Sequence, residues 1–119
     1  MISFTANQIG CEDFEGTLIA GIGDESIGYI MFQRGMIPET GSDDLPYFEF
    51  DDQTNGGSDV IKSVELSGDL LIVHTDEIKI GESLFEIKLD ANQEESRELV
   101  SQLEKIFSGH ENLLSINDA

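Results

Sequence analysis

Most of the chain before residue 90 has hydrophobic patterns typical of β-strands, either strict alternation of hydrophobic and polar residues or short apolar runs. Short runs of β-branched and aromatic residues are separated by segments rich in turn residues, and two pairs of runs are close enough to form hairpins. These hairpins are expected to turn at residues 23–26 and 67–69. The pattern predicts strands at residues 3–9, 17–22, 27–34, 47–51, 60–66, 70–74 and 84–89, with 3–9 at a sheet edge and loops at 35–46 and 52–58.

The strand predicted at residues 47–51 alternates strictly. Phe48 and Phe50 share one face, whereas Tyr47, Glu49 and Asp51 share the other. Successive side chains of a strand point to opposite faces of a sheet, so the phenylalanines are expected to be buried. The other three side chains are then expected to lie on the exposed face.

The period of the hydrophobic pattern changes from two to about 3.6 after residue 90, which predicts one amphipathic helix at residues 93–108. Asn92 and Glu95 have the spacing of a capping box, and Gly109 suits the end of a helix. The apolar stripe contains Leu99, Val100, Leu103, Ile106 and Phe107. We expect this stripe to cover the sheet face that bears Phe48, Phe50, Val64 and Ile87.

The 119 residues contain no internal repeat and no linker, and a chain of this length forms one domain. We therefore predict a single α+β domain over residues 1–119. Its fold is expected to be an antiparallel sheet of about five to seven strands, with one C-terminal amphipathic helix packed across one face. Residues 110–119 form a polar tail, in which Leu113, Leu114 and Ile116 can dock on the sheet.

Charge is the most unusual property of the composition. The chain has 25 Asp and Glu residues against 6 Lys and Arg residues, a formal net charge of −19 at pH 7. So acidic a protein is expected to repel nucleic acid and anionic membranes. The longest apolar run, residues 70–73, is too short to span a membrane, and no signal peptide is apparent. The chain has a single cysteine, Cys11, which cannot form an internal disulfide. We therefore expect a cytoplasmic protein.

Sequence motifs for catalysis or cofactor binding are weak, so we expect no enzyme activity and no cofactor. Gly21, Gly23 and Gly28 miss the spacing of a dinucleotide-binding loop, and a strand follows them where a helix is required. Residues 51–56 resemble the start of a calcium loop, but Lys62 stands where a bidentate Glu is required. Cys11 has two acids beside it, which would raise the pKa of its thiol, and the two histidines have no local partner.

The stretch from residue 35 to residue 61 contains no Lys or Arg and is the best candidate for a binding surface. It holds seven acids, which either form a solvated face or attract a basic partner. Tyr47 lies among them, and aromatic side chains are common interface anchors. The predicted partner-binding residues are Asp43, Asp44, Tyr47, Glu49, Asp51 and Asp52, and adventitious binding of a divalent cation by the four aspartates stays open.

Several segments resemble the immunity protein 10 family of bacterial polymorphic toxin systems. The segments are residues 29–34, 47–53 (Tyr-Phe-Glu-Phe-Asp-Asp-Gln), Gly56-Gly57, 64–67 with Leu70, 85–90 and the helix that ends with residues 105–107. Together they extend the resemblance over about residues 16–109. The resemblance implies a small α+β cytoplasmic protein that binds and neutralises a cognate toxin, and it assigns no catalytic residue. Charge further suggests that the toxin domain is basic, as a nuclease would be. Two alternatives stay open: an acidic nucleic-acid mimic that occludes DNA-binding proteins, and an enzyme that uses carboxylates with a divalent metal.

Overall fold

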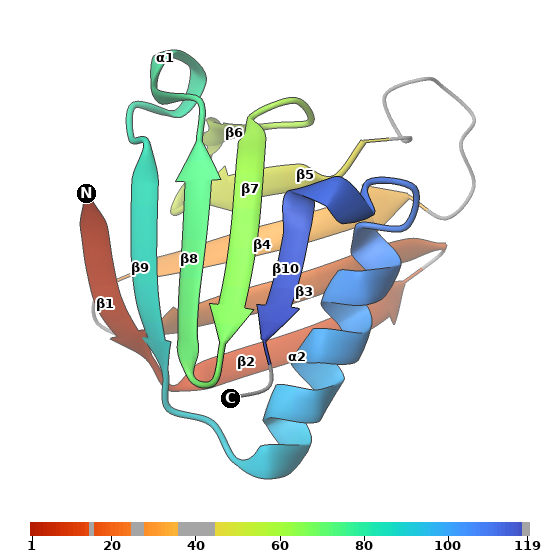
Figure 1. Ribbon diagram of the computed structural model, residues 1–119. Coiled ribbons are helices and arrows are strands. Elements are labelled where there is room, and N and C mark those ends of the chain that lie inside the picture. Colours follow the sequence, from red (N-terminus) through yellow and green to blue (C-terminus); the bar gives the residue numbers. More distant parts are fainter. Residues whose placement is uncertain (15, 25–27, 36–44, 118–119) are drawn as a thin grey trace.

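The computed structural model describes residues 1–14, 16–24, 28–35 and 45–117, which form two five-stranded sheets and one main helix (Figure 1). The front sheet has the order β1 (Ile2–Ala6), β9 (Leu84–Leu89), β8 (Leu70–Thr75), β7 (Ile61–Ser67) and β10 (Leu114–Asn117). The back sheet is a meander of β2 (Gln8–Phe14), β3 (Thr17–Asp24), β4 (Gly28–Gly35), β5 (Tyr47–Phe50) and β6 (Asp52–Gly57). The helices are α1 (Glu77–Ile80), α2 (Gln93–Ile106) and a 3-10 turn, Glu111–Leu113.

The predicted α+β class and the C-terminal helix are confirmed, but the strands divide between two sheets rather than one. The back sheet is antiparallel throughout, whereas β1 and β10 pair in parallel with β9 and β7 at the edges of the front sheet. The segment expected as a loop at 52–58 contains β6. Its sequence is polar and rich in glycine, so it shows no alternation and becomes a strand by pairing with β5.

Aromatic rings hold the two sheets together. The rings of Phe48 and Phe50, on the back sheet, have their centroids 5.2 and 5.1 Å from that of Phe85 on the front sheet. The ring centroid of Phe32 lies 5.4 Å from that of Phe48 and 6.0 Å from that of Phe107, the residue that caps the C-terminal end of α2. Edge-to-face packing of this kind adds to the hydrophobic stabilisation of a core. One continuous core therefore joins both sheets and α2.

Helix α2 begins with the capping box that its sequence predicts, and near its end it receives hydrogen bonds from Arg34 that the sequence did not indicate. The Asn92 side chain accepts from the Glu95 amide at 2.8 Å, and the Glu95 carboxylate accepts from the Asn92 amide at 3.1 Å. At the other end, Arg34 Nη1 donates to the carbonyl oxygens of Ile106 and Ser108 at 2.9 and 2.5 Å. These bonds satisfy backbone groups that have no partner inside the helix.

Four of the five residues in the apolar stripe are buried, as expected, and Val100 is partly buried. Helix α2 packs chiefly against β2, β3 and β4. The expectation that it covers one face bearing Phe48, Phe50, Val64 and Ile87 is wrong. The two phenylalanines lie on the back sheet and the two aliphatic residues on the front sheet, and the two sheets pack against each other there. Gln102, which is also buried, donates to the carbonyl oxygens of Glu12 and Ile19 at 2.8 and 3.2 Å and so ties the helix to β2 and β3.

The C-terminal tail docks as its apolar residues suggest. Strand β10 pairs in parallel with β7, placing Leu114 opposite Val64 and Ile116 opposite Leu66. Both tail residues are partly buried against the core.

Across the described residues, no helix has the length and apolar character that crossing a bilayer requires.

Candidate functional site

The outer face of the back sheet carries the two candidate binding residues that the structure brings together. On β5, Phe48 is buried in the core, whereas Tyr47 and Glu49 point to the opposite side. The register between β4 and β5 places Met31 opposite Glu49 and Gln33 opposite Tyr47. Tyr29 lies two residues before Met31 and therefore faces outward beside Glu49.

Glu49 is covered by the two tyrosines, and its side chain is only 5% exposed. Both phenolic hydroxyls donate to its carboxylate: Tyr29 to Oε2, and Tyr47 to Oε1 at 2.8 Å. The expectation that Glu49 is exposed is therefore wrong, although the expected face is right. We call Tyr29, Tyr47 and Glu49 the Tyr–Glu–Tyr cluster.

The carboxylate of this cluster has neutral partners and no cation. All six Lys and Arg residues lie in the described part of the chain, and none of them forms an ion pair with Glu49 there. Burial, and then the hydrogen bond to Glu49 and its negative charge, raise the pKa of Tyr47 from an ordinary value of 10.0 to about 12. Tyr47 therefore remains a hydroxyl donor at any physiological pH.

Asp51 leaves the strand pattern instead of joining Tyr47 and Glu49 in one row. The register shifts between Glu49 and Phe50, and Asp51 has a positive φ of 59°. Its amide donates to the Tyr29 carbonyl at 3.0 Å, and its Oδ1 accepts from the Tyr29 amide at 2.8 Å. Gly28 allows this approach, because a Cβ there would overlap the Asp51 carboxylate. Asp51 thus fixes the backbone that carries Tyr29.

The other candidate residues are not placed by the structure. Asp43, Asp44 and the side chain of Asp52 lie outside the residues that the structure describes, so their predicted part in binding stays a prediction. The described members of the set are therefore Tyr47 and Glu49, which touch each other, and Asp51, which supports Tyr29 from the side.

Glycines surround the Tyr–Glu–Tyr cluster for two different reasons. Added Cβ atoms at Gly23 and Gly56 would meet Tyr29 Cβ at 2.9 Å and Tyr47 Oη at 2.7 Å, so these positions admit the tyrosines. Gly10 and Gly21 pair across β2 and β3, and neither has a positive φ. An added Cβ would meet nothing within 4 Å at Gly10, and at Gly21 it would meet only the Gly10 carbonyl oxygen, at 3.8 Å. Together with Gly23 and Tyr29, these two glycines line a hollow of about 580 Å³.

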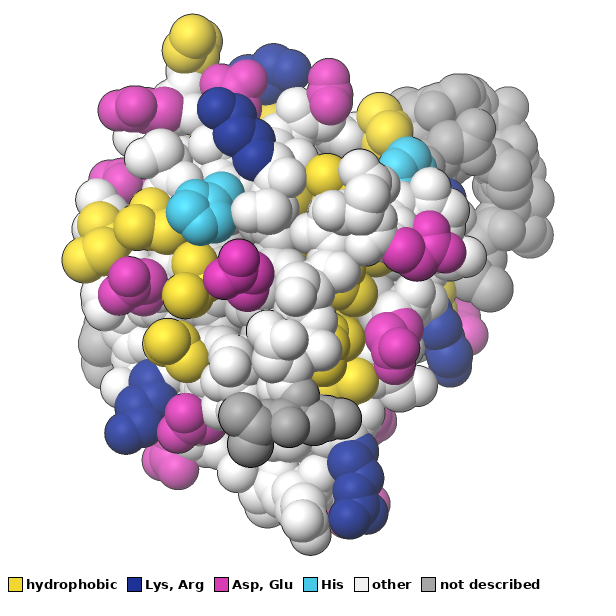
Figure 2. Space-filling view, in the orientation of Figure 1, with side chains coloured by type: hydrophobic (Ala, Val, Ile, Leu, Met, Phe, Trp, Pro, Cys, Tyr) yellow, Lys and Arg dark blue, Asp and Glu magenta, His cyan; other side chains and the backbone are white. Residues whose placement is uncertain are grey.

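A second groove lies at the boundary between the front sheet and α2. Its volume is about 600 Å³, and its lining includes Leu66, Ile116 and Val100 together with Arg97 and Glu104. Figure 2 shows hydrophobic side chains along this boundary, whereas acidic side chains are spread over the whole visible face. The spread of acids means that charge alone does not mark one binding site on this side.

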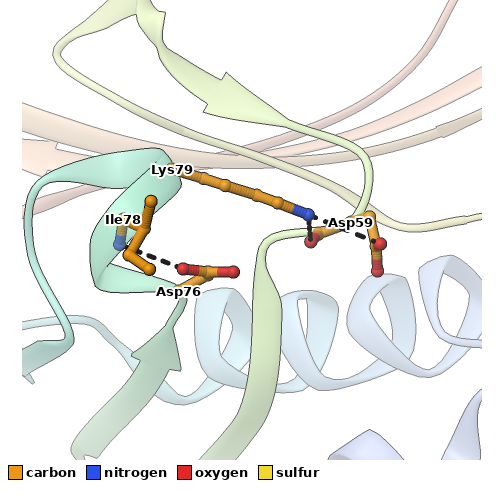
Figure 3. A network of polar contacts seen from close by, with 4 residues as sticks. All are labelled: Asp59, Asp76, Ile78 and Lys79. Atoms are coloured by element: carbon orange, nitrogen blue, oxygen red, sulfur yellow. Dashed lines mark hydrogen bonds and ion pairs between the residues drawn. The ribbon is translucent and has the colours of Figure 1, made fainter.

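Helix α1 presents a single apolar side chain on a fixed turn (Figure 3). Asp76 Oδ1 accepts from the Ile78 amide at 3.0 Å, and Gly81 ends the turn in the left-handed conformation. Lys79 Nζ donates to the Asp59 carbonyl at 3.1 Å and lies 3.5 Å from its carboxylate. Ile78 is 96% exposed. A lone exposed isoleucine is common on protein surfaces, so α1 by itself does not indicate a site.

The motifs that sequence alone leaves open for catalysis or metal binding have structural roles. Gly21 and Gly23 lie within β3, and Asn55 Nδ2 donates to the Phe50 carbonyl at 3.3 Å as part of the β5–β6 pairing. Cys11 is partly buried beneath α2, and burial, followed by the charge of Glu98, raises the pKa of its thiol to about 11. The direction is as expected, but the cause is burial and a helix residue rather than the neighbouring acids. Among the described residues, no three His, Cys, Asp or Glu side chains gather as a metal site would require.

Comparison of the chain with family models, with curated proteins and with solved structures gives no match. The resemblance to the immunity protein 10 family therefore rests on the residues quoted for it above.

Tyr29 is the site residue that sequence reasoning misses. Ile30 and Phe32 are buried, and side chains alternate along a strand, so Tyr29 is expected to face outward. Its position beside Glu49 depends on the register between β4 and β5. That register is not readable from the sequence, because residues 36–46 between the strands form too long a connection to fix it.

Proposed function

We propose that this chain is a binding protein that neutralises a cognate bacterial toxin in the cytoplasm, and that the toxin domain it binds is basic. The resemblance to the immunity protein 10 family supports this proposal. The physical observation that carries it is unneutralised negative charge. Even if every Lys and Arg paired with one acid, 19 acidic side chains would lack a cation.

Such an excess of charge weakens the folded state through self-repulsion, and a cationic partner would relieve that repulsion. A toxin that acts on nucleic acid needs basic side chains to hold phosphates, so its active site would be complementary to this surface. Opposite charges also accelerate encounter, which can raise association rates to roughly 10⁸ M⁻¹s⁻¹ at low salt. Rapid capture suits a protein that must bind a toxin before the toxin acts.

Co-expression with a neighbouring toxin domain tests this function. The variable C-terminal domain of a secreted protein encoded beside this chain is expressed in a bacterium, with and without the chain. We expect the domain alone to arrest growth and the chain to restore it, with the two proteins co-purifying as one complex. Continued arrest, although the folded chain is present, would contradict the proposal.

The same preparation distinguishes neutralisation of one toxin from nucleic-acid mimicry. Purified chain is added to several unrelated DNA-binding proteins, and their affinity for a DNA duplex is measured. A neutraliser of one toxin leaves these affinities unchanged. Loss of DNA binding by several of them would favour the acidic mimic instead.

A further inference from the structure

The outer face of the back sheet has no described element packed on it. Helix α2 and the front sheet pack on its inner side, where their buried residues share one core with Phe32 and Phe48. The first turn of α2 also reaches the hollow beside Tyr29 through Glu95. On the outer side, Tyr29, Met31 and Tyr47 are partly exposed. The exposed parts of these side chains are the surface on which the inference is built.

The two tyrosine rings on this face are fixed in place. Their hydroxyls donate to the same carboxylate, and Gly23 and Gly56 leave the space that the rings need. The double hydrogen bond of Asp51 to the Tyr29 backbone adds a further restraint. Rings that are already ordered lose little conformational entropy when a partner binds, which is one reason tyrosines dominate many interfaces.

The charge beneath the rings selects the kind of partner. Glu49 supplies a negative charge that no Lys or Arg neutralises within the described residues, and the face of an aromatic ring is itself electronegative. We infer that a Lys or Arg side chain of a basic protein partner binds against the rings of Tyr29 and Tyr47, with Glu49 providing the complementary charge. This inference rests on the proposed function and names the surface through which it acts.

Gly10 and Gly21 leave space on the sheet surface into which the backbone of the partner would fit. A glycine inside a strand weakens the strand and often marks a close approach of another backbone. Neither glycine is required by its own φ, and an added Cβ at Gly21 would meet only the Gly10 carbonyl, at 3.8 Å. The hollow that these glycines leave beside Tyr29 has room for the extended segment that carries the basic side chain.

Peptide probes test the site without knowledge of the toxin. Two capped pentapeptides, Gly-Gly-Arg-Gly-Gly and Gly-Gly-Gln-Gly-Gly, are titrated into the full chain while its amide and tyrosine ring resonances are followed by NMR. We expect saturable shifts at Tyr29, Tyr47, Gly10 and Gly21 with the arginine peptide and none with the glutamine peptide. Shifts spread evenly over the acidic surface would overturn the inference.

Three variants separate this site from general attraction to an acidic protein. Glu49→Gln removes the charge, and Gly21→Val places a side chain in the hollow while the three residues of the cluster stay unchanged. Glu65→Gln removes one exposed charge from the front sheet and is the matched control. The first two are expected to weaken arginine-peptide binding by about tenfold or more, and the control by less than about twofold. Circular dichroism confirms folding of each variant, and Gly21→Val keeps the test decisive if Glu49→Gln does not fold.

Growth rescue then shows whether the site serves the proposed function. Wild-type rescue that is lost in folded Gly21→Val and kept in Glu65→Gln supports both proposals. Rescue that is kept in Gly21→Val and in Glu49→Gln overturns the site but leaves the function standing. Peptide binding at the tyrosines without any rescue by the wild type overturns the function but leaves the cation site.

Discussion

Glu49 shows how a single residue changes its role once its neighbours across the sheet are known. The side chain points outward, as alternation predicts, yet two tyrosine hydroxyls enclose it. A lysine at this position would bring an ammonium group, which cannot accept a hydrogen bond, against two hydroxyl donors. Charge reversal there would therefore disturb the fold as well as binding, which is why Glu49→Gln is the better probe.

Titration of Tyr47 checks the cluster directly. The chain has two tyrosines, so a Tyr29→Phe variant reports Tyr47 alone through tyrosinate absorbance near 295 nm. We expect the pKa of Tyr47 in this variant to lie above its ordinary value of 10.0, chiefly because the side chain is partly buried, and to fall when Glu49→Gln is added, because the hydrogen bond and the charge of Glu49 also raise it. A pKa of 10.0 in the folded protein would contradict the cluster.

The raised pKa of Tyr47 also sets how the contribution of this residue to stability depends on pH. The folded state holds the Tyr47 proton more tightly than the unfolded state, so this contribution to stability is complete below pH 10. It is lost as pH rises from 10.0 to about 12. Urea unfolding at pH 9 and pH 11.5, followed by circular dichroism, should show a smaller loss for Tyr47→Phe than for the wild type.

Elements differ in how clearly the sequence specifies them. Helix α2 combines a 3.6-residue period with a capping box, so both its existence and its start are predicted. Strand β6, Asp-Gln-Thr-Asn-Gly-Gly, has the composition of a loop and becomes a strand only because β5 offers a partner. Asp76 and Gly81, which cap the single turn of α1, are residue types that favour the start and the end of a helix. They are the signal in the sequence that could have predicted α1.

Leu103 tests the packing of α2, since it lies in the middle of the buried stripe and is completely inaccessible to solvent. Leu103→Ala is expected to lower the free energy of unfolding by about 2–5 kcal/mol, because it removes buried methyl groups and leaves a cavity. Ser101→Ala, at an exposed position of the same helix, is the control and should change stability by less than about 0.5 kcal/mol. Urea denaturation measures both, and a loss at Leu103 as small as that of the control would mean that the stripe is not core.

The arrangement of the whole molecule is the part that sequence reasoning determines least. Alternation tells which side chains of a strand share a face, but it does not tell which sheet the strand joins. Here the chain starts in the front sheet with β1, builds the back sheet with β2 to β6, and returns for β7 to β9 and β10. The parallel pairs β1–β9 and β7–β10 join segments distant in sequence, and no local turn specifies such pairs.

Net charge makes a prediction at this largest scale. A formal charge of −19 on a chain of 119 residues repels itself in the compact state more than in the expanded unfolded state. Salt shortens the range of that repulsion, from roughly 30 Å at 0.01 M to 3 Å at 1 M. We therefore expect the melting temperature to rise between about 10 mM and 500 mM NaCl. A gain of about 1 kcal/mol corresponds to a shift of roughly 3–8 °C for a domain of this size.

The identity of the cation decides whether this stabilisation is general screening or a specific site. Sodium, potassium and choline chlorides at equal ionic strength should raise the melting temperature equally, since screening depends on ionic strength rather than on the fit of an ion. Magnesium and calcium chlorides, at matched ionic strength, are measured alongside them by differential scanning calorimetry. A flat or falling melting temperature with sodium chloride would mean that self-repulsion does not limit the stability of this fold. A saturable rise at low calcium concentration alone would instead indicate a divalent-cation site.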